Sequence, residues 1–183
     1  MKILISLILL LISAPATALD FHPTIAIYSF YNRINDPNID YYDDWKPIDN
    51  ISSINLGLTL SHNNFTIGTT TNRLFNRTVD RRVKMRQSGK IYDSSMHIIT
   101  DSVYLSYNVK RWQPSLFLTN ARVKRGLYQN DTVIKETKKT AILYGVSLGY
   151  FFTKNIQGSL VFVAPNKELF IEGGFGLGVN LFF

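Results

Sequence analysis

The chain has 183 residues, with 20 lysine and arginine residues against 13 acidic ones, a formal charge of +7 and no cysteine. The absence of cysteine excludes a disulfide-stapled domain and a lipid-modified cysteine. The content of aromatic and β-branched residues argues against disorder, and the length suits a single domain.

The first residues have the pattern of a secretory signal peptide. A single lysine precedes an apolar run over residues 3–12, and Ala16–Ala18 fits the small-residue rule for cleavage. The run is short for a spanning helix, which needs about 20 residues, and Pro15 follows it. We therefore expect residues 1–18 to be a signal peptide and residues 19–183 to be one exported domain.

Alternation of apolar and polar residues predicts eight strands after this segment, because successive side chains of a strand point to opposite faces. One face of most strands is apolar and the other is rich in glycine, serine, threonine and asparagine. The faces of the fifth strand stay open. In the last strand, Leu169 and Ile171 are predicted to share the apolar face of Phe175. The predicted strands are about 22–31, 51–61, 65–72, 98–109, 114–123, 140–152, 156–164 and 169–183.

The predicted connections alternate between long, charged segments and short turns. His62–Asn64 is a predicted tight turn, because asparagine tolerates left-handed backbone dihedrals. The long connections are acidic Asn32–Asp49, with two basic and five acidic residues, basic Arg73–Ser95, with seven and two, and basic Arg122–Lys139, with six and two. An even number of antiparallel strands with this alternation is typical of bacterial outer-membrane barrels. The competing fold is a soluble calycin-like barrel with a ligand inside, which would need a polar exterior.

The chain resembles the small eight-stranded outer-membrane barrels: the OmpA transmembrane domain, OmpX and the opacity proteins. The stretch "GVNLFF" resembles the signal that the barrel-assembly machinery reads, with Gly178, Leu181 and Phe183 as its positions. The resemblance implies an all-β, eight-stranded antiparallel up-and-down transmembrane β-barrel. It also implies the cell outer membrane as location, outer-membrane lipids and the assembly machinery as partners, and a monomer.

The lumen of an eight-stranded barrel is just wide enough to be filled by side chains. Glu172 is the clearest charge predicted to point inward, and it needs a partner there. A buried ion pair and a gated proton or ion path are both open interpretations. The candidate partners are Arg73, Arg122 and Lys124. The aromatic residues predicted to fill the lumen are Tyr28 or Phe30, Tyr104 and Phe170.

No cofactor or metal site is predicted, because none of the three histidines has a partner at metal-ligand spacing. His97 lies near serines and aspartates in the sequence, so the ingredients of a lipid A-modifying enzyme are present. No motif of such enzymes occurs, and we assign no catalytic residue. The neighbours of His97 are Asp93, Ser94, Ser95 and Asp101.

The basic connection after the third strand is the main candidate for binding. Nucleic acid is not a plausible partner for an exported membrane protein, whereas lipopolysaccharide phosphates lie next to extracellular loops. Arginine suits phosphate through paired hydrogen bonds. We therefore expect a structural or surface-interaction role, with a lipid A-modifying enzyme and a small-solute channel as alternatives. The predicted anion-binding residues are Arg77, Arg81, Arg82 and Arg86.

Overall fold

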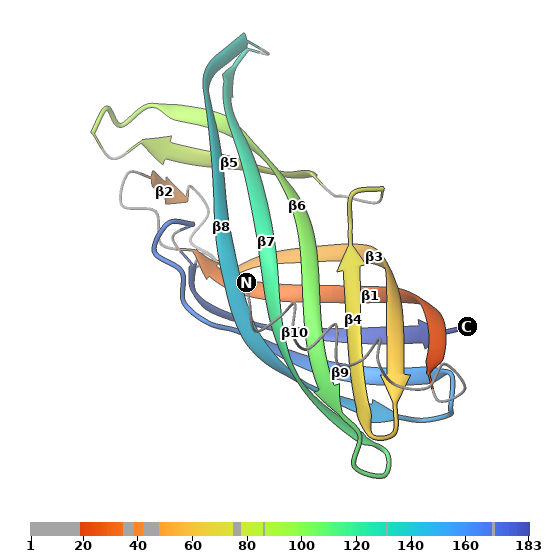
Figure 1. Cartoon of the computed structure of the whole chain (residues 1–183). Helices are drawn as coiled ribbons and strands as arrows, with labels where there is room; N and C mark the ends of the chain where they lie inside the picture. Colours follow the sequence, from red (N-terminus) through yellow and green to blue (C-terminus); the bar gives the residue numbers. More distant parts are fainter. Residues whose placement is uncertain are drawn as a thin grey trace.

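All regular structure in the described part of the chain is β (Figure 1). The computed structural model describes residues 19–34, 39–41, 48–74, 78–85, 87–130, 132–169 and 171–183, so the predicted signal peptide lies outside the described residues. No helix among these residues is long and apolar enough to cross a membrane. The strands are β1 (Asp20–Ile34), β2 (Ile39–Tyr41), β3 (Ile48–His62), β4 (Phe65–Thr71), β5 (Thr78–Met85), β6 (Ile91–Tyr107), β7 (Trp112–Gln129), β8 (Thr132–Phe151), β9 (Ile156–Val163) and β10 (Ile171–Phe182).

Eight of these strands close into a ring, as predicted. The order β1-β3-β4-β6-β7-β8-β9-β10 is antiparallel throughout, and β10 pairs with β1 over 24–34 to complete it. Closure matters because it leaves no unpaired sheet edge and satisfies the backbone hydrogen bonds in a medium without water. The ring confirms the predicted eight-stranded antiparallel barrel.

Two strands, β7 and β8, are much longer than predicted. The segment Arg122–Lys139, expected to be a loop, is instead the continuation of β7 and β8, which are 18 and 20 residues long. A membrane-crossing strand needs only about 9–11 residues, so this hairpin projects well beyond a bilayer (Figure 1). The prediction was wrong because it followed apolar residues alone, and charged residues replace them on the outer face where the strands leave the barrel.

The basic connection Arg73–Ser95 also contains strands. Its β5 pairs with the upper part of β6, whereas β4 pairs with the lower part, so β6 changes partner along its length. Asn72 bridges the change: its side chain accepts a hydrogen bond from Thr100 N at 2.8 Å and donates one to Ile98 O at 3.1 Å. The buried amide thus replaces the sheet bonds that neither strand supplies there.

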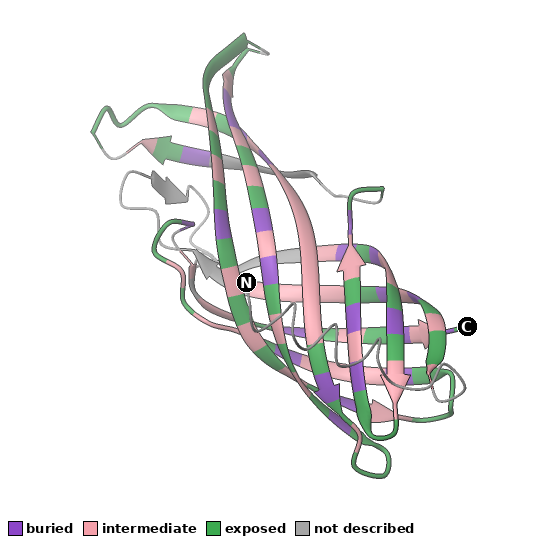
Figure 2. Cartoon of the chain, in the orientation of Figure 1, coloured by how far each residue is buried: buried purple, intermediate pink, exposed green. Residues whose placement is uncertain are grey.

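Exposed residues recur along the strands of the ring (Figure 2), and on its outer face many of them are large and apolar. Leu58, Val146 and Phe175 are exposed, as their predicted outward orientation requires, while Thr59 on the opposite face is buried. The predicted fifth strand, whose inner and outer faces the sequence leaves open, lies within β7. The exposed leucines of β7 show which of its faces is the outer one. A soluble protein rarely exposes so continuous an apolar surface. The exposed outer leucines of β7 are Leu116 and Leu118.

Aromatic pairs mark the two ends of this apolar band. Near the short turns, Trp112 packs against Tyr150 with ring centroids 4.8 Å apart, and Phe65 packs against Tyr107 at 4.9 Å. Near the other end, Phe175 stacks on the neighbouring tyrosine of β1 at 5.1 Å. Phe175 lies eight residues before the last residue of the sequence, about 26 Å along the strand, or ~20 Å of height at the usual tilt. Aromatic girdles at this spacing suit the two surfaces of a bilayer.

A β-bulge corrects the predicted faces of the last strand. In β10, Gly173 pairs with Arg33 and Ile171 with Ile34, so one residue between them is skipped, and Gly173 has a φ of 131°. The bulge shifts the alternation by one position. Leu169 and Ile171 therefore turn toward the inside, where Leu169 is buried, and the prediction that they share the face of Phe175 was wrong.

The glycines of the inner face make room for aromatic rings of the paired strand. Four ring–glycine pairs lie directly opposite each other in the sheet, and a Cβ on each glycine would overlap the ring. Tyr28, Phe30 and Tyr104 point inward, as predicted; Phe170 lies outside the described residues. The pairs are Tyr28–Gly178, Phe30–Gly176, Tyr104–Gly68 and Phe117–Gly145.

We expect an arginine on the outer face to be costly only within the apolar band. Val146→Arg should lower the free energy of unfolding from lipid vesicles by roughly 2–4 kcal/mol, because the charge meets hydrocarbon. Thr140→Arg is the matched control, since Thr140 lies on the same face of β8 above the band and should cost about 0–1 kcal/mol. Equal costs for the two variants in urea titrations would contradict the assigned membrane level.

We expect Gly68→Ala to destabilise the barrel by about 1–3 kcal/mol, because the added methyl group overlaps the Tyr104 ring. The same change in a Tyr104→Ala background should cost much less, since the ring is gone. Urea unfolding of the two single variants and the double variant measures this coupling. Strict additivity would show that the ring and the glycine are packed independently.

Candidate functional site

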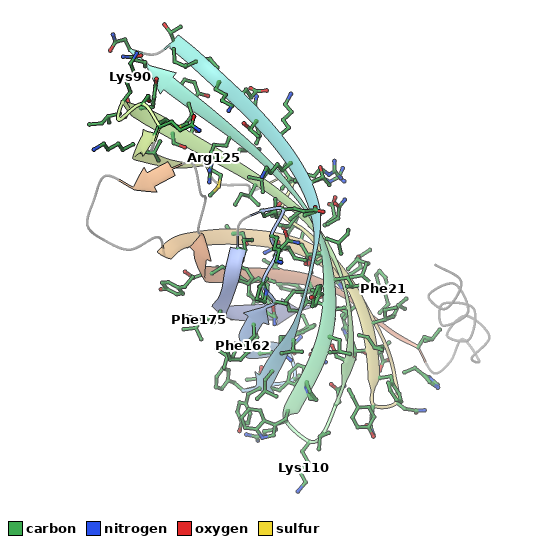
Figure 3. All side chains as sticks on the ribbon, turned by 90° about the vertical axis from the view of Figure 1, so that its left-hand side faces the viewer. Phe21, Lys90, Lys110, Arg125, Phe162 and Phe175 are labelled. Carbon is green, nitrogen blue, oxygen red and sulfur yellow. The ribbon has the colours of Figure 1, made fainter. Side chains whose placement is uncertain are left out.

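The upper parts of β5, β6, β7 and β8 form a basic extension above the barrel (Figure 3). Lys90 and Arg125 lie in it, while Lys110 lies at the opposite tip of the molecule. The outer face changes character at Asp101, which is paired with Thr71 on β4 and Asn120 on β7. Below this row the outward residues are mostly apolar, and the charged outward residues of β7 and β8 lie above it.

Asp101 is held between two arginines on the outer face. Arg73 Nη2 donates to Asp101 Oδ2 at 2.6 Å and Arg73 Nε to Oδ1 at 2.9 Å, while Arg122 Nη2 donates to Oδ2 at 2.8 Å. Thr71 Oγ1 adds a bond to Oδ1 at 2.8 Å. The hydrogen bonds from Arg73, with further help from Thr71 and the charge of Arg122, lower the pKa of Asp101 to about 2. One carboxylate thus fixes two guanidinium groups at the membrane border.

A second carboxylate repeats the arrangement higher on the hairpin. Lys124 and Lys138 are directly opposite each other in the sheet, a pairing that repels without a counter-charge. Glu136 lies between them, with its oxygens 2.7 Å from Lys124 Nζ and 3.1 Å from Lys138 Nζ. The hydrogen bond from Lys124, followed by that from Lys138, lowers the pKa of Glu136. Each clamp joins two cations to one carboxylate, so each clamp keeps a net positive charge.

The inner face of the same hairpin carries three further cations. Arg125, Lys135 and Lys139 line the upper end of the lumen. Arg125 Nη2 lies 3.8 Å from the sulfur of Met96, and Lys139 Nζ donates to the backbone oxygen of Glu168 at 2.8 Å. The alternation of β7 and β8 therefore separates two sets of cations, one facing out and one facing in.

The lower lumen ends in a layer of hydrogen-bonded amides. Gln157 Nε2 donates to Gln113 Oε1 at 2.7 Å, and Asn180 Nδ2 donates to Gln157 Oε1 at 2.7 Å. Tyr28 donates to Asn180, and Gln113 continues the chain to Asn108. The three central amides are each less than 10% exposed. Because their polar atoms bond one another, this layer closes the described lumen on the short-turn side.

The predicted anion-binding arginines fall mostly outside the described residues. Arg77 and Arg86 lie there entirely; the backbones of Arg81 and Arg82 belong to β5, opposite Ser94 and Asp93, but their side chains are not described. The extended hairpin was not predicted from the sequence, and it supplies most of the described cations of the basic extension. A signal for it exists, because apolar residues alternate with basic ones from Arg122 onward. The alternating apolar residues are Val123 and Leu127.

Two other predicted sites, the lumen charge Glu172 and the assembly signal, lie on β10 or directly after it. The side chain of Glu172, predicted as a lumen charge, lies outside the described residues. Its candidate partners Arg73 and Arg122 form ion pairs with Asp101 on the outer face, and Lys124 forms one with Glu136. For the assembly signal, Gly178 lies under the Tyr28 ring, and Phe183 is exposed, with its backbone N–H bonded to Pro23 O at 3.0 Å. Its role in assembly, with Leu181, stays a prediction.

His97 does not meet a serine and a carboxylate together. Asp93 and Asp101 share its face of β6 but are four residues away, about 13 Å along a strand, and Ser95 is about 7 Å away. Ser94 is buried on the opposite face. A catalytic triad needs these groups within hydrogen-bonding distance. Among the described residues, no group of three or more histidine, aspartate or glutamate side chains is placed to hold a metal ion.

The fold has counterparts among solved structures. Ail, the attachment invasion locus protein of Yersinia pestis, aligns at a TM-score of 0.58 and 13% identity, covering 89% of this chain and 97% of Ail. Neisserial surface protein A aligns at a TM-score of 0.46 and 12% identity, covering 90% and 99% of the two chains. No protein-family model and no curated protein matches the sequence. The chain has the fold of the small eight-stranded outer-membrane barrels, as the resemblance predicted.

We expect the Asp101 clamp to stabilise the protein in a pH-dependent way. The folded pKa of about 2 is below the unfolded value of about 3.9, so the stabilisation is complete above pH ~4 and is lost as the pH falls toward 2. Asp101→Asn should flatten the urea-unfolding free energy over this window, and so should the double change Arg73→Gln with Arg122→Gln. A wild-type profile in both variants would show that the clamp contributes nothing.

Proposed function

We propose that this protein is an integral outer-membrane barrel, exported by its signal peptide, that binds surface polyanions through the outer face of its basic extension and performs no chemistry. The partner class is the phosphate groups of lipopolysaccharide or a similar polyanion, and the protein acts as a monomer. The observation that carries the proposal is the pair of clamps, in which Asp101 and Glu136 each hold two cations beside the membrane.

The position of these clamps suits an anion at the membrane surface. The apolar band ends just below Asp101, so Arg73 and Arg122 lie at the height where lipid phosphates begin, and Lys124 and Lys138 follow about 7 Å further along the strands. A carboxylate that holds two cations reduces their conformational freedom, which lowers the entropy lost when they bind an anion. Guanidinium groups then offer their remaining N–H donors to phosphate oxygens. The clamped cations are Arg73, Arg122, Lys124 and Lys138.

A protein of the same fold has been solved with a polyanion. Ail was crystallised in complex with sucrose octasulfate, a heparin analogue. This supports a polyanion as the class of ligand for a barrel of this shape, while the residues that would bind it here are argued from this chain alone. The predicted arginines of β5 and its flanks would extend the same positive surface.

The alternatives find less support in the described residues. A lipid-modifying enzyme would need His97 beside a serine and a carboxylate, and the strand spacing separates them. A small-solute channel would need an open, continuous path through the lumen, and the hydrogen-bonded, buried amide layer around Gln157 occupies that path. Both arguments favour binding at the extension over reaction or passage.

Replacing the outward cations should weaken polyanion binding. We expect Arg122→Gln, Lys124→Gln and Lys138→Gln together to reduce the affinity of refolded protein for deacylated lipopolysaccharide by about tenfold, since each exposed contact contributes less than ~1 kcal/mol. The wild-type affinity should fall with added salt, because exposed charges are screened. A second arm replaces Arg77, Arg81, Arg82 and Arg86 with serine.

The matched control removes three cations from the opposite rim, by Lys110→Gln, Arg111→Gln and Lys154→Gln. This variant has the same net charge as the first and should keep the wild-type affinity. Equal losses at both rims would indicate a non-specific charge effect, and no loss in either of the first two arms would remove the extension as the binding site. Isothermal titration calorimetry measures all four proteins.

A further inference from the structure

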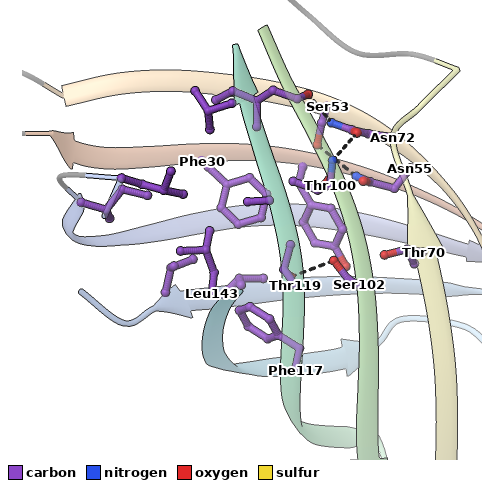
Figure 4. Close-up of a pocket in the computed structure, with 18 of the residues that line it drawn as sticks. Phe30, Ser53, Asn55, Thr70, Asn72, Thr100, Ser102, Phe117, Thr119 and Leu143 are labelled. Carbon is purple, nitrogen blue, oxygen red and sulfur yellow. Dashed lines mark hydrogen bonds between the residues drawn. The ribbon is translucent and has the colours of Figure 1, made fainter. Parts of the chain in front are cut away.

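The lumen contains a cavity of about 430 Å³ that runs from the amide layer to the basic extension, and this volume is within the range of about 300–1,000 Å³ typical of small-molecule sites (Figure 4). One wall, formed by β3, β4 and β6, is largely polar, with Met96 and Ile98 towards its upper end. Within it Thr100 N donates to Asn72 Oδ1, and Ser102 is hydrogen-bonded to Thr119 of the adjoining β7. The other wall, formed by β8, β9, β10 and the segment before β10, is apolar towards the mouth and polar towards the amide layer, where Ser159, Gln157 and Asn180 line it. Its apolar side chains are Leu143, Val161, Val163, Leu169 and Ile171.

The apolar wall is unusual for the inside of an outer-membrane barrel, which is normally polar. Leu169 is buried against Ala121 and Ala141, but Val123, Leu143 and Ile171 pack on this cluster while remaining partly exposed to the lumen. Apolar surface left in contact with water costs about 25 cal/mol per Å². A ligand tail that covers this apolar surface removes it from water and is favoured by about the same free energy per Å².

The charged groups that line the cavity, among the described residues, are all basic and all lie at its upper end. Arg125, Lys135 and Lys139 come from β7 and β8, above the apolar wall. Long basic side chains of this kind lay their methylene stems along apolar surface and extend the charge beyond it. At the lower end, the layer around Gln157 closes the lumen. The cavity thus has a cationic mouth, an apolar body and a closed floor.

We propose that this cavity binds a single-chain amphiphile with an anionic head, namely a free long-chain alkyl carboxylate. Its tail lies along the β8–β10 wall and covers the exposed methyl groups of Leu143 and Ile171. Its carboxylate accepts charge-assisted hydrogen bonds from the inward cations of the hairpin. The closed floor makes this a site of binding rather than passage. This site is distinct from the outward clamps that carry the proposed function.

The test uses dodecanoate as the probe, with protein refolded into phosphatidylcholine nanodiscs so that no detergent competes. The inner triple variant is Arg125→Gln, Lys135→Gln and Lys139→Gln, and the outer triple variant is Arg122→Gln, Lys124→Gln and Lys138→Gln. Both lose the same charge from the same two strands. Binding is measured by displacement of a fluorescent undecanoate, with protein-free nanodiscs subtracted to remove partition into the lipid.

The expected result is a loss of about tenfold in dodecanoate affinity for the inner triple variant and no change for the outer one, because only the inward cations reach the head group. A second measurement needs no variant: wild-type protein should bind dodecanoate well and dodecyltrimethylammonium, which has the same tail and the opposite charge, at least about tenfold more weakly.

Equal affinity of the inner and outer variants, equal binding of the two amphiphiles, or no binding above empty nanodiscs would each overturn the proposal. The result is independent of the polyanion test, because deacylated lipopolysaccharide has no acyl chain and its binding is assigned to the outer cations. Heat-modifiable electrophoretic mobility confirms that each variant is folded before it is measured.

Discussion

The pairing of β1 with β10 is the contact on which the rest of the structure depends. It runs from Thr24 opposite Phe182 to Ile34 opposite Ile171, and it turns an open sheet into a ring. Without it, two strand edges would present unpaired N–H and C=O groups, and each such group costs several kcal/mol in hydrocarbon. Once the ring is closed, backbone polarity no longer matters to the lipid. The position of the barrel in the membrane then depends only on its outward side chains: apolar ones lie in hydrocarbon and charged ones in water.

The outward side chains of the β7–β8 hairpin change in type along its length. Below the row of Asp101 and Asn120, its leucines and tyrosine face out, and its serines and threonines face in. Above that row Arg122, Lys124 and Lys138 face out, and Val123 and Leu127 face in beside the inward cations. The strands continue without a bulge across the row, so the backbone does not cause the inversion. The apolar face changes side because the outer medium changes from hydrocarbon to water.

The sequence was sufficient for the ring because each crossing strand keeps one apolar face, and the tight turn was predictable because Asn63 adopts a φ of 54° that asparagine tolerates. It was insufficient for the extension, because a search for outward apolar residues stops at Asn120. The bulge at Gly173 was equally hidden, since glycine serves both as a bulge residue and as space for an aromatic ring. The Asp101 clamp could not be predicted from the sequence. Its residues Arg73, Asp101 and Arg122 are far apart in the chain, and only the register of β4, β6 and β7 brings them together.

The same inversion explains how one hairpin presents two chemically different surfaces. Alternation sends Arg122, Lys124 and Lys138 outward, where carboxylates hold them, and Arg125, Lys135 and Lys139 inward, above apolar walls. The outward cations are accessible to water-soluble polyanions, the ligand class that we propose for them, and such contacts are sensitive to salt. The inward cations lie above apolar surface, so an anion bound there, as we propose, gains affinity from an apolar tail. A period of two residues thus places neighbouring lysines of one strand in two chemically different surroundings.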